Sequence, residues 1–172
     1  MRVVFGIIYT PFIPGGEELE GAIDVARASL KGCNVDVYDL AADVLTVIDV
    51  VGDFDVMLLV APSTLGSIGT IRRTVYSLPT HTYDPFEIVN SIHASIEGSL
   101  DAHDLIKALD AMLSAQGKHA RLILYECTRG SCKRALEDAI REASLLAGCS
   151  NSPKKHGQRK EEYYEQDDQD YR

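Results

Sequence analysis

The segment FDVMLLV at residues 54–60 is apolar at every position except Asp55. A strand with one face in solvent alternates apolar and polar side chains, so a continuous apolar run predicts a strand that is covered on both faces. Strands of this kind are typical of parallel sheets with helices on each side. The segment therefore favours an α/β fold in which this strand is central.

Strands and helices are predicted to alternate through residues 1–149. Apolar, β-branched segments predict further strands over 3–9, 35–38 and 121–126. Helical spacing of apolar side chains predicts helices over 17–30, 101–116 and 133–146, with another near 44–51. The alternation predicts a single three-layer α/β domain, with a mainly parallel sheet flanked by helices on both faces.

Length and charge restrict the functional class. The 172 residues, of which 45% are apolar, fit one domain with a buried core. The chain has 17 Lys and Arg against 26 Asp and Glu, and this net charge of −9 opposes the approach of a polyanion. We therefore expect one domain that does not bind nucleic acid.

The composition changes after Cys149. Residues 150–172 contain no aliphatic side chain. They hold five of the 17 basic and six of the 26 acidic residues, which leaves a net charge of −8 on residues 1–149. A segment with only tyrosines to bury does not offset the entropy cost of ordering. We expect a folded domain over 1–149 and a polar, disordered tail over 150–172, either solvated or ordered by a partner.

The longest apolar stretches, at 2–8 and 57–61, are far shorter than the roughly 20 residues that span a bilayer. The amino terminus runs directly into a strand-like segment, without the apolar region and small-residue cleavage site of a signal peptide. We expect no membrane span and a cytoplasmic location.

The four cysteines are Cys33, Cys127, Cys132 and Cys149. A chain of this size in a reducing compartment does not need disulfides, so free thiols are expected. Cys127 and Cys132 precede the last predicted helix, but their spacing fits neither a CxxC redox pair nor a zinc knuckle. Lys133 occupies the position where a thiol phosphatase has its arginine, so the state of these two cysteines stays open.

Two loops, at residues 9–18 and 61–69, are expected to flank the ligand site, because ligands of parallel α/β sheets gather at the carboxyl ends of the strands. The first loop carries Glu17 and Glu18 at the start of a helix. Carboxylates there stabilise the helix and also suit a cation, but they repel a phosphate. The second loop carries Ser63, although spacing alone defines no catalytic triad.

His103 lies in the first turn of the predicted helix over 101–116, beside Asp101 and Asp104. Imidazole and carboxylate groups are common metal ligands. The residues alone leave open whether His103 is a surface side chain or part of a metal site.

Together the motifs resemble the hydrogenase maturation proteases. The resemblance spans residues 1–148 and rests on segments that occur in the family's order: FG at 5–6 with GGEELEG at 15–21, VDVYDL at 35–40, DVMLLVA at 55–61, APSTLGSIGTIR at 61–72 and SLDAHDLIKAL at 99–109. The first loop looks like the family's glycine-rich acidic loop, and 61–72 looks like its DAVDLGxxPGTIR segment. Residues 99–109 are similar to its SxHxxGLxxLL element.

The resemblance implies a metal-dependent endopeptidase. Members of the family clip a C-terminal extension from the large-subunit precursor of nickel–iron hydrogenase after nickel insertion, using a Glu, an Asp and a His as metal-contacting residues. Glu18 matches the acidic residue of the first loop, and His103 matches the histidine. The implied partner is such a precursor, and the implied metal is nickel, that of the partner subunit.

The sequence departs from the family at Ala61, which occupies the position of the metal-contacting aspartate. Loss of one ligand weakens a metal site, and Asp101, Glu17 or Ser63 are the candidates for a third ligand. The resemblance therefore implies either a divergent peptidase or a catalytically silent relative that acts as an interaction module.

A flavodoxin-like, flavin-binding protein is the alternative from another class. The order of the strands also resembles that family, and PST at 62–64 suits its third-strand loop. The acidic pair Glu17 and Glu18 does not suit the flavin phosphate that the first loop of a flavodoxin holds.

Overall fold

The computed structural model describes residues 1–10, 12–40, 53–82, 84 and 102–149. Its elements, in chain order, are β1 (Val3–Ile7), the 3₁₀ helix η1 (Gly16–Leu19), α1 (Ala22–Ser29), β2 (Val35–Asp39), β3 (Val56–Pro62), β4 (Ile71–Leu78), α4 (Ala102–Gln116), β5 (Ala120–Cys127) and α5 (Cys132–Leu146). The predicted helix near 44–51 and the tail over 150–172 lie outside the described residues.

The five strands form one sheet in the order β2-β1-β3-β5-β4. Neighbouring strands are parallel except for β4, which runs antiparallel to β5. All seven residues of β3 are buried, as the apolar run at 54–60 predicts. The predicted α/β class with a mainly parallel sheet is confirmed.

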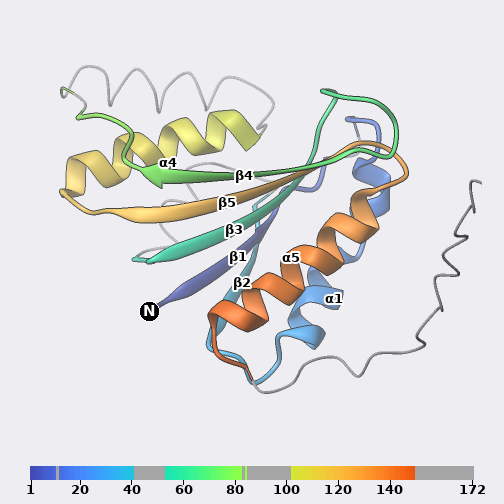
Figure 1. The fold of residues 1–172 in the computed structure, drawn as a ribbon, viewed down its shortest axis with the longest axis horizontal. Coiled ribbons are helices and arrows are strands. Elements are labelled where there is room, and N and C mark those ends of the chain that lie inside the picture. The colour runs from blue at the N-terminus through green and yellow to red at the C-terminus, as the bar shows by residue number, and fades with distance from the viewer. Residues whose placement is uncertain (11, 41–52, 83, 85–101, 150–172) are drawn as a thin grey trace, which may run out of the picture.

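Helices cover both faces of the sheet (Figure 1). On one face, α4 packs through Leu105 and Leu109 onto alternate residues of β3 and β5 such as Leu59 and Leu124. On the other face, α1 and α5 pack onto the remaining alternate residues. The side on which a strand residue points therefore decides which helix it meets.

The helix predicted over 17–30 is divided into η1 and α1. Gly21 separates them with a φ of 71°, in the left-handed region that glycine adopts without steric cost. This division leaves Glu17 and Glu18 in η1, ahead of α1.

Strand β4 was not predicted. Its sequence IRRTVYSL carries Arg72 and Arg73 side by side, which interrupts the period-2 apolar pattern. In the structure the two arginines point to opposite faces, and each pairs with a glutamate. A charged edge strand of this kind is stabilised by tertiary contacts that sequence periodicity does not reveal.

The expectation of free thiols is wrong. Cys33 forms a disulfide with Cys149, and Cys127 forms one with Cys132. The Cα atoms are 5.5 Å apart in the first pair and 5.0 Å apart in the second, distances that a disulfide spans. The sequence expectation rested on compartment and chain size, whereas the fold brings these residues together in pairs.

Among the helices in the described residues, none has the length and apolarity needed to cross a bilayer.

Candidate functional site

A row of three residues crosses the carboxyl end of the central strands. Glu126 on β5 is the register partner of Ala61 on β3 and of Arg72 on β4. Register partners on adjacent strands point to the same face of a sheet. Ala61 packs in the core beneath α4, so Glu126 and Arg72 project to the α4 side as well.

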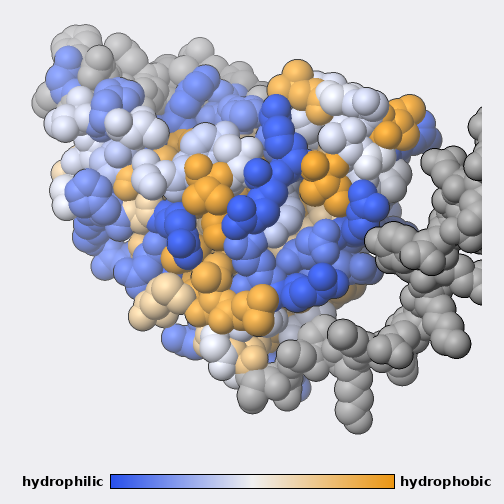
Figure 2. Space-filling view, viewed as in Figure 1, coloured by the Kyte–Doolittle hydropathy of each residue, from blue (hydrophilic) through white to orange (hydrophobic). Residues whose placement is uncertain are grey.

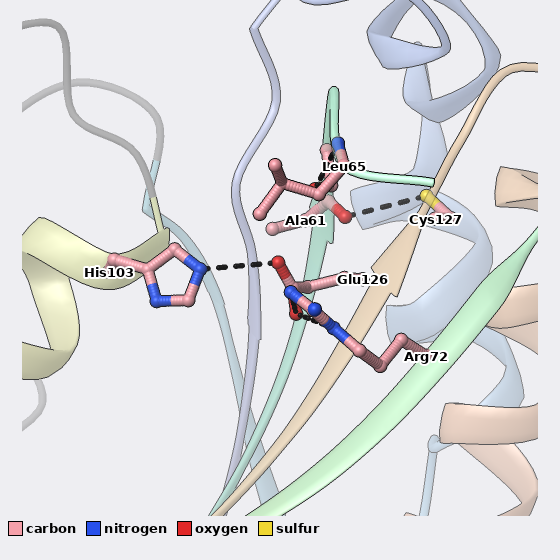
Figure 3. A network of polar contacts seen from close by, with 7 residues as sticks. Ala61, Leu65, Arg72, His103, Glu126 and Cys127 are labelled. Atoms are coloured by element: carbon pink, nitrogen blue, oxygen red, sulfur yellow. Dashed lines mark hydrogen bonds and ion pairs between the residues drawn. The ribbon is translucent and has the colours of Figure 1, made fainter. Parts of the chain in front are cut away.

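The carboxylate of Glu126 joins Arg72 to His103 (Figure 3). Its Oε2 atom accepts a hydrogen bond of 2.7 Å from Arg72 Nε and lies 2.5 Å from Arg72 Nη2. Its Oε1 atom lies 3.3 Å from Nε2 of His103, which is in the first turn of α4. Three elements therefore supply the cluster: β4, β5 and α4.

Exposure differs sharply within this cluster. The Glu126 side chain is 4% exposed, whereas those of Arg72 and His103 are 49% and 44% exposed. A buried carboxylate is costly unless it is paired and hydrogen-bonded, and the Arg72 guanidinium supplies that compensation. Solvent or a ligand meets the imidazole and the guanidinium while the carboxylate stays beneath them.

Glu18, one of the predicted metal residues, lies at a helix terminus. Its carboxylate accepts the backbone N–H of Gly130 and, at 3.1 Å, that of Cys132. The first N–H groups of a helix lack partners within the helix, so Glu18 satisfies donors at the start of α5. The side chain is thereby fixed on the α5 side of the sheet.

Glu17 and Ser63, two candidates for a third ligand, also make local contacts. Glu17 Oε2 accepts the N–H of Gly15 at 2.9 Å, and Oε1 lies 3.6 Å from Arg129 Nε. Hydrogen bonds from its own backbone N–H and from that of Gly15 lower the pKa of Glu17. Ser63 Oγ accepts the N–H of Leu65 at 3.1 Å, as in a short turn. The other candidate, Asp101, lies outside the described residues.

Glu18 and His103 both lie near the carboxyl end of the sheet, but their hydrogen bonds lead to different partners on its two faces. The described residues contain no group of three His, Cys, Asp or Glu side chains that could hold a metal ion. The ligand set that the resemblance implies therefore stays a prediction.

Sequence reasoning missed Glu126 and Arg72. The sequence did contain two signals: Glu126 ends a predicted buried strand, and Arg72 ends the segment GTIR at 69–72, which matches the family. Neither signal shows that Glu126 lies beside Ala61. These two residues are 65 positions apart in the sequence, and they become neighbours only through the pairing of β3 with β5. Register of this kind requires the sheet itself.

Three loops around the site are tied together. Gly69 N–H donates to the carbonyl of Arg129 at 2.9 Å, and Thr70 N–H donates to Thr128 Oγ1 at 2.9 Å. Arg129 in turn lies near Glu17 of the first loop. The loops after β1, β3 and β5 therefore form a continuous rim.

The rim carries exposed apolar side chains at Phe12, Leu65 and Ile68, which are 91%, 59% and 82% exposed. Figure 2 shows separate hydrophobic patches among hydrophilic residues at the end of the molecule where the loops after β3 and β5 lie. The strand ends are therefore surrounded by a surface of mixed polarity.

The described residues of the first loop, 9–10 and 12–18, do not form the phosphate cradle that the flavodoxin-like alternative needs. The N–H of Gly15 in this loop is taken by Glu17, and the carboxylate of Glu18 is occupied by the N–H groups of Gly130 and Cys132 at the start of α5. The antiparallel β4 also replaces the last parallel strand of the flavodoxin-like order. The geometry does not favour a flavin site.

No protein-family model matches the chain, and no curated protein matches it. Solved structures to which the chain is similar include hydrogenase maturation proteases. The [NiFe] hydrogenase maturation protease HybD from Thermococcus kodakarensis is 12% identical, with a TM-score of 0.48 over 86% of this chain and 99% of that chain. The hydrogenase maturating endopeptidase HybD from Escherichia coli is 14% identical, with a TM-score of 0.49 over 86% and 94%.

A hydrogenase 2 maturation peptidase from Thaumarchaeota archaeon SCGC_AB-539-E09 is 15% identical, with a TM-score of 0.44 over 85% of this chain and 95% of that chain. The function therefore has to be argued from the side chains of this chain.

Proposed function

We propose that this chain is a divergent maturation-type endopeptidase that clips the C-terminal extension of a nickel–iron hydrogenase large-subunit precursor. The observation that carries the proposal is the contact between Glu126 and His103 beside Ala61. By the resemblance, the family has a metal-contacting aspartate at the position of Ala61 and a metal-contacting histidine at the position of His103. A carboxylate from the neighbouring strand stands next to the vacated position and meets the same histidine.

In this proposal the nickel belongs to the precursor. Glu18 holds the start of α5 and Glu126 is neutralised by Arg72, so neither carboxylate is free to bind a cation without giving up a partner. A closed metal site needs three or four ligands, and the described residues offer no such group. His103 is the residue that contacts the metal the precursor carries. The sequence predicts a cytoplasmic location, but the two disulfides do not favour one, because disulfides are rare in reducing compartments.

The reaction is hydrolysis of one peptide bond. Water adds to the carbonyl carbon, the bond to nitrogen breaks, and the proton of the water leaves with the departing amine. A metal ion near the carbonyl oxygen would polarise it for this attack. The chain's own contribution is to present His103 at the strand ends, with its ring held by the buried carboxylate.

The test is a cleavage assay on a nickel-loaded precursor, followed by mass spectrometry. We expect His103→Ala to abolish cleavage and Glu126→Gln to slow it by about 10- to 100-fold, the usual effect of removing a carboxylate that orients a metal-contacting histidine. Glu142→Gln is the matched control, because it also removes a glutamate paired with an arginine of β4, but on the other face. This control variant should cleave at the wild-type rate.

Two results would overturn the proposal. Binding of the precursor without cleavage by the wild-type protein would indicate the catalytically silent interaction module instead. Cleavage that is unchanged in His103→Ala would place the reaction elsewhere on the molecule.

A further inference from the structure

The contact between Glu126 and His103 has a defined direction. A carboxylate that already accepts hydrogen bonds from a guanidinium has only lone pairs to offer. The nitrogen that faces it, His103 Nε2, must therefore be the one that carries the proton. In the neutral imidazole, this leaves Nδ1 with the lone pair that binds a cation or accepts a proton.

The position of Glu126 is in turn determined by Arg72. Two of the guanidinium nitrogens, Nε and Nη2, meet the same oxygen, Oε2, so Oε1 is left for His103. Arg72 and Glu126 are directly opposed across the antiparallel β4–β5 pair, and the backbone ladder therefore sets their separation. The chain of contacts runs from the edge strand through a buried carboxylate to a half-exposed ring, as Figure 3 shows.

We propose that Arg72 and Glu126 are positioning residues that hold His103 in the Nε2–H form with Nδ1 available to a ligand. The inference rests on the proposed function only for the identity of that ligand, the nickel of the precursor. A carboxylate that accepts one ring N–H and fixes the other nitrogen for chemistry is a recurring arrangement around metal-contacting and catalytic histidines.

The alternative role for the Arg72–Glu126 pair is to attach β4 to the sheet. Strand β4 offers an internal comparison, because the next residue, Arg73, pairs with Glu142 of α5 on the opposite face and is also partly exposed, at 44% against 49% for Arg72. Both pairs join β4 to its surroundings, but among the described residues only the first continues to a histidine. Arg73→Met is therefore the matched control for Arg72→Met.

The experiment is nitrogen-15 NMR of the full chain with labelled histidine, with the His103 signals assigned by their loss in His103→Gln. In the wild-type protein with a neutral ring, we expect Nε2 to carry the proton and Nδ1 to carry none. The Nε2 proton should also give an observable signal. Arg72→Met and Glu126→Gln should lose this proton signal and shift both nitrogens toward the tautomer mixture of free imidazole.

The conservative variant Arg72→Lys should restore part of the wild-type spectrum, and Arg73→Met should leave it unchanged. Thermal unfolding of each variant shows whether it is folded when its spectrum is recorded. Equal loss of the Nε2 proton signal in Arg72→Met and Arg73→Met would overturn the inference, because it would show a general effect of weakening β4. A wild-type ring protonated on Nδ1 would overturn it as well.

These spectra need no precursor, so the inference and the proposed function fail separately. If the Nε2–H form is fixed but no precursor is cleaved, the positioning role stands and the proposed function is wrong. If cleavage occurs and the variants leave the His103 ring unchanged, the positioning role is wrong.

Discussion

At the scale of single residues, Glu18 shows how one side chain can match two roles. By its place in the first loop it resembles a metal-contacting residue, but in the structure its carboxylate accepts two N–H groups at the start of α5. Capping of this kind requires no metal, and it is a property that acidic side chains near helix starts share.

We expect Glu18→Ala to lower the free energy of unfolding by about 1 kcal/mol, the usual loss when a capping side chain is removed from a helix terminus. Chemical denaturation measures this change. Glu20→Ala is the control, because Glu20 is an exposed residue of the same segment. Unchanged stability in Glu18→Ala, together with lost cleavage of the precursor, would instead support the metal-contacting role.

At the scale of elements, α5 is connected to the edge strand through one polar network. Arg73 on β4 donates to both oxygens of Glu142 on α5, at 2.9 and 2.6 Å, and Tyr125 Oη donates to Glu142 at 2.5 Å. The hydrogen bond from Arg73 lowers the pKa of Glu142. Burial, followed by the contact with Glu142, raises the pKa of Tyr125 to about 12.

This network predicts that the stability of the fold falls both at acid pH and at strongly alkaline pH. A lowered carboxyl pKa stabilises the fold above the ordinary Glu range, and this contribution is lost as the pH falls through the lowered value. A raised tyrosine pKa stabilises the fold at pH values below the ordinary tyrosine pKa of about 10. This stabilisation is lost as the pH rises toward about 12. Glu142→Gln should therefore flatten the stability profile at the acid end.

Denaturation at a series of pH values measures the acid effect, and ultraviolet titration of the tyrosines measures the alkaline one. Tyr125→Phe should remove the tyrosine ionisation near pH 12. A stability profile of Glu142→Gln that parallels the wild type down to acid pH would contradict this account of the network.

At the scale of the whole molecule, the Cys33–Cys149 disulfide joins the segment after α1 to the residues after α5, across a sequence separation of 116. A crosslink between distant residues restricts the unfolded chain more than a short one does. The Cys127–Cys132 disulfide, with a separation of 5, closes a small loop between β5 and α5.

We expect Cys33→Ala with Cys149→Ala to lower the free energy of unfolding by about 5 kcal/mol, as loop-closure entropy gives for a loop of this length. Chemical denaturation of oxidised and reduced protein measures the effect, and reduction should not destabilise the double variant by that amount again. Thiol titration of the denatured, unreduced wild-type protein should find no free thiol. Four free thiols would contradict both crosslinks.

The sequence by itself determined the α/β class, the central place of β3 and the helices on both faces. These features follow from apolar periodicity, which is a local property of each segment. It also placed Glu18 and His103 among the residues near the strand ends, through their positions in the loops and in the first turn of α4.

Only the tertiary structure decided that Glu126 stands beside Ala61, that Arg72 on an unpredicted edge strand neutralises it, and that the cysteines are paired. Each of these contacts joins residues through strand register or chain reversal. Register and chain reversal depend on how the whole chain packs, so no single segment encodes them.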